Sequence, residues 1–247
     1  MKTKTIVLIT LCAIFVAISI GLLVPICPSS KLYDYILNKC VLGSSGWKIT
    51  GYFTPVERDY VNDSFLSVYV KSNQNDNYDY IENDSKYYEK EFPSRFIAEV
   101  NVEGSGKTRD DKILQTWIGD YIYPGGNKTR FYHFESCPRT SSGICLPLIP
   151  NSSEGDVVMV AVTNGSTDLS TGVIAHGTMF HILNIASPWN SKIFWAVDVG
   201  EWHDKHVDVF TGYGLKAREE ANRITKLPPD ESGTVLVIGF RSTNETK

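Results

Sequence analysis

The sequence has no cluster of lysine and arginine residues. Its 24 basic residues are outnumbered by 28 acidic ones, which gives a net charge of -4. Binding to nucleic-acid phosphates requires clustered basic side chains, so we expect no nucleic-acid partner. The chain also lacks the G-x-S-x-G turn of Ser-His-Asp hydrolases and any internal repeat of solenoid or propeller length.

Cysteine is scarce, with five residues in 247. Cys12 lies within an N-terminal apolar run, which leaves an even number outside it. An even count is compatible with disulfides in an oxidising compartment. The short-loop pairing joins Cys27 to Cys40 and Cys137 to Cys145, and the other connectivities remain open.

Residues 6–27 contain no charged side chain. At about 1.5 Å per residue this run is long enough to cross a hydrocarbon layer of roughly 30 Å. Lys2 and Lys4 precede it, so the positive-inside rule places the N-terminus in the cytoplasm and the rest of the chain outside the cell. A cleaved signal peptide, which would make the protein secreted, is the alternative. Because the run is longer than usual and no A-x-A site ends it, we predict a membrane anchor in residues 1–27.

Six N-x-S/T sequons agree with an extracellular location and predict a glycoprotein. Their asparagines are Asn62, Asn83, Asn127, Asn151, Asn164 and Asn244.

The remainder of the chain is predicted to form a stalk over residues 28–46 and one domain over residues 47–247. The domain contains a polar, acidic loop at 73–91. Short apolar segments separated by Gly-rich turns predict strands, among them WKITGYFTP at 47–55 and FIAEVNV at 96–102. Residues 214–225 alone have the apolar spacing of a helix. The pattern favours an all-β barrel or sandwich with one late helix.

Two aspartates are predicted to stand in adjacent strands, Asp198 in FWAVDVG and Asp208 in KHVDVF. Apolar neighbours disfavour the charged form of a carboxyl group, and a second carboxylate nearby raises its pKa further. A carboxyl group that keeps its proton near neutral pH can donate it to a glycosidic oxygen. The alternative is that these aspartates cap turns or pair with basic side chains. For two of them flanking a short connection, we favour a catalytic role.

The stretch AVDVG, HVDVFTGYG, LKAREEANRIT and TVLVIGF resembles the C-terminal signature of the 3D (Asp-Asp-Asp) domain family. It is similar in particular to membrane-bound lytic murein transglycosylases of type A. Earlier elements follow in the family's order, namely GYFTP, EGSGKT, TSSG and VIAHGTMFHI. The resemblance covers about residues 47–240.

The resemblance implies a six-stranded double-psi β-barrel of the barwin and expansin type, with an inserted β-rich segment. It makes Asp208 the catalytic acid and base and gives Asp198, with Gly200, a supporting role. The implied reaction is non-hydrolytic. Asp208 protonates the linking oxygen and then deprotonates the sugar's 6-hydroxyl, which closes onto C1. This reaction requires no cofactor and no metal, and its substrate is a murein-like or other surface polysaccharide cleaved by a monomeric enzyme.

The chain departs from the family pattern after Gly200, where residues 201–205 replace a glycine-rich connection. The family's third aspartate has its nearest candidate in Asp168, displaced by an insertion. Aromatic and polar side chains near the two aspartates are expected to contact the sugar. These substrate-binding candidates are Trp202, His206, Gly200 and Tyr52.

Three other functions compete with this interpretation. His203 and His206 suggest a zinc site, but alternation along a strand would point them in different directions. AVDVG is similar to the loop of aspartic proteases, but a second copy of that loop is missing. The strongest alternative is a non-catalytic module of the expansin type that binds glycan without cleaving it.

Overall fold

The structure is a computed structural model that describes most of the chain after the predicted anchor. The described residues are 27, 31–34, 36–71, 87–116, 121–122, 128–129, 131–141, 143–146, 157–200, 202, 204–225 and 232–241. Residues 6–26 of the predicted anchor and 73–86 of the predicted loop lie outside this set. None of the helices formed by the described residues is long and apolar enough to cross a membrane.

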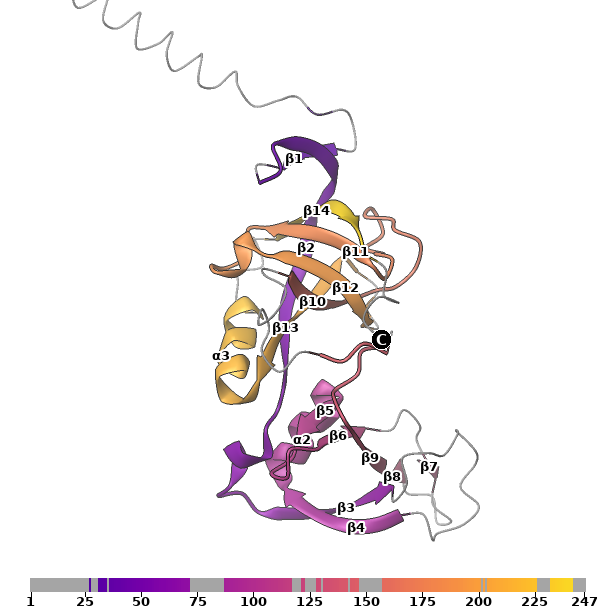
Figure 1. Ribbon diagram of the computed structural model, residues 1–247, viewed down its shortest axis with the longest axis vertical. Coiled ribbons are helices and arrows are strands. Elements are labelled where there is room, and N and C mark those ends of the chain that lie inside the picture. Colours follow the sequence, from indigo (N-terminus) through magenta and orange to yellow (C-terminus); the bar gives the residue numbers. More distant parts are fainter. Residues whose placement is uncertain are drawn as a thin grey trace, which may run out of the picture.

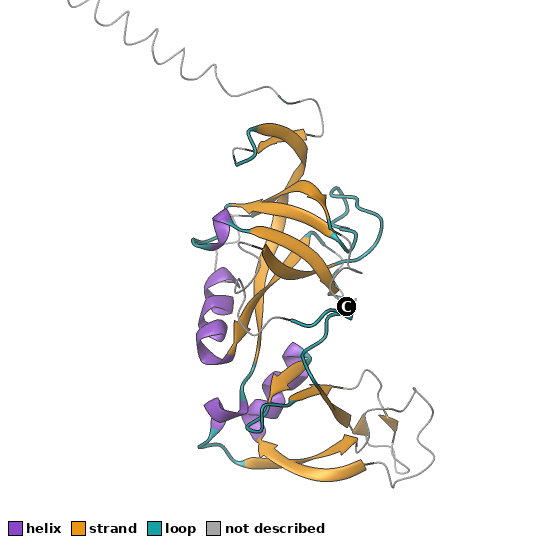
Figure 2. Ribbon diagram, viewed as in Figure 1, coloured by secondary structure: helices purple, strands orange, loops and turns teal. Residues whose placement is uncertain are grey.

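The larger sheet closes into a six-strand barrel (Figures 1 and 2). Around the barrel lie β2 (Lys39–Thr54), β13 (His206–Tyr213), β10 (Val157–Val162), β12 (Ile193–Val199), β11 (Thr178–Leu183) and β14 (Gly233–Phe240), and β14 pairs back onto β2. The strands alternate apolar residues toward the interior, which Trp47, Phe180 and Phe194 fill as fully buried side chains. The predicted β-barrel is therefore confirmed.

Helix α3 (Gly214–Thr225) is the predicted late helix, and it packs against β2 and β13 (Figure 1). Its buried residues Ala217, Ala221 and Ile224 follow the helical period of three to four. The helix approaches β2 so closely at Gly51 that a Cβ there would lie 2.6 Å from the Cα of Ala221. Gly51 is therefore required by the packing of helix on strand.

A second sheet forms the inserted β-rich segment, in the order β4-β3-β9-β6-β5. Its strands are β3 (Phe65–Lys71), β4 (Tyr87–Pro93), β5 (Ser105–Lys107), β6 (Ile113–Thr116) and β9 (Phe131–Glu135), with a separate pair β7 (Tyr121–Ile122) and β8 (Lys128–Thr129). The short helix η1 (Glu57–Tyr60) connects β2 to this unit, and η3 (Trp189–Ser191) follows β11. Figure 1 shows β2 running from the barrel into the second unit.

The prediction of a strand at 96–102 is wrong, because the segment lies in a second helix, α2 (Ser94–Glu103). The side chains of Phe96, Ile97 and Val100 are all buried on one face, in the core of the second sheet. Pro93 precedes the helix and Gly104 ends it in the left-handed conformation, with φ 81°. Burial of this face outweighs the weak helix propensity of the β-branched residues.

Two further segments differ from the sequence-based expectation. The predicted stalk contains β1 (Lys31–Asp34) and the beginning of β2, which pair antiparallel. The end of the predicted loop is strand β4, which pairs with β3 along its length. Backbone pairing orders both polar segments, although neither has a clear apolar period. The disulfides are Cys27–Cys40 and Cys137–Cys145, the short-loop pairing.

Candidate functional site

Four residues form a row across the outside of the barrel. Ala161 of β10 pairs with Asp198 on one side and with Asp208 on the other, and Asp208 pairs with Thr50 of β2. The residues beside Ala161, Asp208 and Thr50 along their strands, such as Val160 and Val207, belong to the buried core, so these three lie on the opposite face, and Asp198 pairs with Ala161. Both carboxylates are partly exposed. The two predicted aspartates thus belong to one surface, and neither is sealed in the core.

The aspartate strands are consecutive in the chain but not neighbours in the sheet. β10 lies between them, which corrects the expectation of directly adjacent strands. Two strand spacings place the backbones of Asp198 and Asp208 about 10 Å apart. Ala161 between them carries only a methyl group. The hydrogen bonds that the described residues make to each carboxylate come from other groups, so the two acids do not bond each other.

The pKa of Asp208 is raised to about 6. Burial is the largest cause, and the charge of Asp198 adds to it. The hydrogen bond from the hydroxyl of Thr50, at 2.7 Å, and the charge of Lys48 oppose the rise. Asp208 can therefore exchange a proton near neutral pH, which an acid–base residue requires.

A histidine positions this carboxylate through Thr50. The hydroxyl of Thr50 donates to Asp208, so it accepts from Nε2 of His206, 2.7 Å away. His206 is buried, and burial together with the charge of Lys48 lowers its pKa to about 4. The imidazole is therefore neutral at pH 7. The ring nitrogen of His206, which was predicted to bind substrate, is hydrogen-bonded to Thr50.

Asp198 is held by backbone amides from two segments. Its Oδ1 accepts from the N–H of Val199 at 2.9 Å and from that of Ser141 at 2.8 Å. Ser141 belongs to the loop closed by the Cys137–Cys145 disulfide, and Ile144 of that loop packs against the buried side of β12. These bonds hold the carboxyl group of Asp198 in place.

Tyr52 lies two residues beyond Thr50 on β2. Its ring contacts Phe210 with 5.3 Å between centroids, and its buried hydroxyl has no hydrogen-bond partner among the described residues. Burial raises the pKa of Tyr52, followed by the charges of Asp198, Asp208 and Glu103. The phenol therefore stays protonated close to three carboxyl groups and retains an unused donor.

Glu103 is a site residue that the sequence analysis did not single out. It is the last residue of α2, and its Oε2 accepts from the N–H of Phe53 on β2 at 3.2 Å. Burial raises its pKa to about 8, and the charge of Asp208 contributes to the rise. Its only sequence signal is its position as the first residue of the EGSGKT element.

Trp202 and Gly200 form a packed unit beside the row. The indole stacks on the ring of His206 with 4.0 Å between centroids, and a Cβ at Gly200 would lie 2.1 Å from the indole. Gly200 is thus the residue that lets the indole lie flat against the chain. Trp202 remains half-buried.

Asp168 is not gathered into this row. It is exposed, and its carboxylate accepts from the backbone N–H and the hydroxyl of Ser170 at 2.9 and 2.6 Å. These bonds lower its pKa and fix the turn. The geometry gives Asp168 the role of a turn cap.

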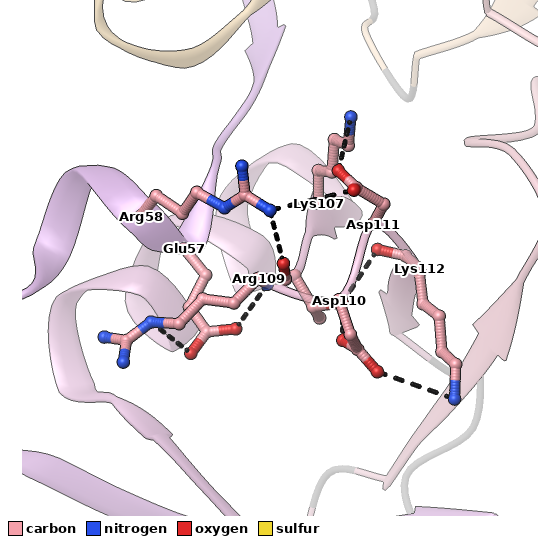
Figure 3. Close-up of polar contacts among 8 residues, drawn as sticks. Glu57, Arg58, Lys107, Arg109, Asp110, Asp111 and Lys112 are labelled. Carbon is pink, nitrogen blue, oxygen red and sulfur yellow. Dashed lines mark hydrogen bonds and ion pairs between the residues drawn. The ribbon is translucent and has the colours of Figure 1, made fainter.

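A cavity of about 280 Å³ lies where η1, the turn after β5 and the end of β13 meet. Figure 3 shows a charged network, of which Arg58, Lys107 and Asp111 line this cavity. Asp111 pairs with Lys107 at 3.0 Å and with Arg58 at 3.7 Å, and Arg109 pairs with Glu57 at 3.1 Å. Opposite charges alternate through the network, so it ties η1 to the turn.

Comparisons with known proteins identify the fold. No family model matches the sequence, and no curated protein is similar to it. The structure is similar to that of Escherichia coli MltA with bound chitohexaose, with a TM-score of 0.50 and 15% identity over 81% of this chain and 72% of that one.

Two further crystal structures are related more distantly. One is MltA from E. coli, described as a unique lytic transglycosylase fold, with a TM-score of 0.42 and 15% identity over 86% of this chain and 75% of that one. The other is MltA from Neisseria gonorrhoeae, with a TM-score of 0.42 and 16% identity over 79% and 72%. The chain has an MltA-like barrel, so the resemblance inferred from the motifs is confirmed at the level of fold.

Proposed function

We propose that the protein cleaves glycosidic bonds in a polysaccharide, in the manner of a lytic transglycosylase, with Asp208 as the acid–base carboxyl group. The observation that carries this proposal is the environment of Asp208. The carboxyl group is partly exposed on the outer row, bonded by Thr50 and has a pKa near 6. The MltA-like fold supports the same reaction class.

The reaction in its simplest form moves one proton through one carboxyl group. Asp208 gives its proton to the linking oxygen while the bond from that oxygen to C1 breaks. The carboxylate then takes the proton of the sugar's own 6-hydroxyl as its oxygen bonds to C1. The products are a shortened chain and a 1,6-anhydro end, and no water is consumed. The charges of Asp198 and Asp208 favour the positive charge that develops at C1.

The substrate class is a murein-like or other surface glycan. The similar structure of E. coli MltA contains bound chitohexaose, a six-unit sugar chain, which supports a glycan substrate. Tyr52 lies two residues beyond Thr50 on β2, and Trp202 stacks on His206, which is hydrogen-bonded to Thr50. Aromatic rings therefore lie near the polar row, a combination that suits a sugar. We place this domain outside the cell, held to the membrane by residues 6–27.

The test uses the full chain with murein and with chitohexaose as separate substrates. Fragments analysed by mass distinguish an anhydro end from a hydrolysed end, because the two differ by one water. Asp208→Asn should abolish release while polymer binding stays. Asp168→Asn, which changes an exposed turn carboxyl group, is the matched control and should cleave normally.

Two outcomes would contradict the proposal. Equal cleavage by Asp208→Asn would remove Asp208 from the chemistry. Retention on polymer by the unmodified protein, with no fragment released from either substrate, would instead indicate the non-catalytic glycan-binding module.

A further inference from the structure

The hairpin formed by β1 and the beginning of β2 carries exposed apolar side chains at one end of the molecule (Figure 1). Ile36 and Leu37 lie in its turn, and Leu32 and Leu42 lie on its two strands, on opposite faces. Ile36 is 52% exposed and Leu42 is 42% exposed. A fluid lipid surface can surround such a tip on more than one side, whereas a flat protein partner covers only one face.

The Cys27–Cys40 disulfide brings the end of the apolar run to this hairpin. The Cα atoms of Cys27 and Cys40 are 5.5 Å apart, and Cys27 is the last residue of the run. Because residues 6–27 are proposed to cross the bilayer, the disulfide leaves no free linker between the hydrocarbon edge and the hairpin. Leu37 lies three residues from Cys40, about 10 Å along the strand. A headgroup layer is about 5–8 Å thick, so the turn lies in or beside it.

The charges of the hairpin suit a lipid surface. Among its described residues, 31–34 and 36–42, the exposed charged side chains are Lys31 and Lys39. The acidic residue, Asp34, is fully buried. Lysine places its apolar stem beside lipid and its ammonium group at the level of the phosphates, and each such lysine strengthens binding to an anionic membrane.

The backbone of the turn is already hydrogen-bonded by the protein. Oδ1 of Asp34 accepts from the N–H of Ile36 at 2.8 Å and from the N–H of Leu37 at 3.0 Å. Oδ2 of the same carboxylate bonds Nδ1 of His181 on β11, 2.9 Å away. An amide that is bonded within the protein loses little when it leaves water. One buried carboxylate thus prepares the turn for an apolar environment and ties it to the barrel.

We propose that the hairpin of β1 and β2 is a membrane-docking surface. Ile36 and Leu37 enter the headgroup layer of the bilayer that residues 6–27 cross, and Lys31 and Lys39 bind lipid phosphates. This inference rests on the membrane placement within the proposed function and is independent of the cleavage reaction.

Docking would also set the position of the acid–base carboxyl group over the membrane. Thr50, which bonds Asp208, lies ten residues along β2 from Cys40. At about 3.3 Å per residue, this places the row no more than about 33 Å from the hairpin. The second sheet lies at the opposite end of the barrel from β1 (Figure 1).

The test measures the depth of the turn in a bilayer. The full chain is reconstituted into vesicles of phosphatidylcholine and phosphatidylglycerol, with a fluorescent amino acid in place of Ile36. Lipids that carry a nitroxide near the headgroup should quench this label, and its emission should shift to the blue. The matched control carries the same label in place of Val102 on α2, which is 79% exposed at the other end of the molecule and should not be quenched (Figure 1).

Charge reversal tests the contribution of the lysines. Lys31→Glu combined with Lys39→Glu should lower the ratio of docked to undocked hairpin by about fivefold for each lysine replaced. Lys216→Glu, which changes an exposed lysine on α3, is the control and should leave the quenching unchanged. Circular dichroism of each variant establishes that it is folded.

The docking inference is overturned if the label at residue 36 is unquenched while the chain stays in the vesicles after alkaline extraction. A blue shift without quenching would mean that another protein surface, such as a second copy of the chain, covers the hairpin, which also overturns it. Loss of the chain from the vesicles overturns the anchor and the docking together. Glycan cleavage enters none of these measurements, so failure of the proposed reaction is recognised separately, by the absence of released fragments.

Discussion

The hydroxyl of Thr50 donates a hydrogen bond to the carboxylate of Asp208, with 2.7 Å between Oγ1 and Oδ1. The two residues are paired across parallel strands β2 and β13, 158 positions apart in the chain. The same hydroxyl accepts a hydrogen bond from the buried, neutral ring of His206. The hydroxyl proton of Thr50 therefore points toward Asp208. Through Thr50, β2 therefore opposes the rise that burial causes in the pKa of Asp208.

Thr50→Val should raise the pKa of Asp208. Valine keeps the shape of threonine but donates no hydrogen bond, and the bond from Thr50 is what most opposes the rise caused by burial. The limb of the pH–rate profile that belongs to Asp208 should move above pH 6. The carboxyl signal of Asp208, followed by NMR through a pH titration, measures the shift directly. Thr50→Ser keeps the hydroxyl and should titrate as the unmodified protein does, and an unchanged pKa in the valine variant would contradict the assigned direction of the bond.

Asp208→Asn should stabilise the fold at neutral pH while it removes activity. The folded protein raises the pKa of Asp208 from 3.8 to about 6, so ionisation favours the unfolded chain and stability declines as pH rises through this window. Asparagine carries no such penalty. The melting temperature of the variant, relative to the unmodified protein, should be higher at pH 7 than at pH 3.5. If the difference in melting temperature does not grow with pH, burial does not disfavour the ionised form of Asp208.

Much of the barrel could be predicted from the sequence. Its strands are either alternating apolar and polar residues or continuous apolar segments, and turn residues separate them. The late helix was predicted with its observed bounds, since Ala217, Ala221 and Ile224 have a helical period. Helix α2 was missed because Ile97 and Val100 are residue types that favour strands. The helix forms because its apolar face packs into the core of the second sheet.

Only part of the row formed by Asp198, Ala161, Asp208 and Thr50 could be predicted from the sequence. Asp198 and Asp208 stood out as acids in apolar strands, but the insertion of β10 between them depends on a parallel crossover that no local pattern encodes. A register shift between Val160 and Ala161 then sets which residue faces both acids. Glu103 could not be found this way, because its relevance comes from a contact between two units far apart in sequence.

Gly51→Ala should destabilise the domain by about 1–3 kcal/mol, because the new methyl group would lie 2.6 Å from the backbone of Ala221 on α3. Helix and strand cannot both keep their positions. Gly239→Ala on β14 is the control, since no atom of the described residues lies within 4 Å of the place that its Cβ would take. Urea unfolding of both variants measures the difference in stability. Equal midpoints would show that α3 can move away from residue 51 without loss of stability.

Asp34→Ala should cost about 3–5 kcal/mol, the range expected when one partner of a fully buried polar pair is removed. The carboxylate of Asp34 is 0% exposed and accepts from Nδ1 of His181 at 2.9 Å and from the N–H groups of Ile36 and Leu37. Removing it leaves three donors without this acceptor and breaks the contact between β1 and β11, while β1 stays paired with β2. Lys112→Ala breaks an exposed pair instead and should cost under about 1 kcal/mol. Denaturant unfolding measures the stability of both variants. A small loss of stability in Asp34→Ala would show that the contacts of the Asp34 carboxylate contribute little to the fold.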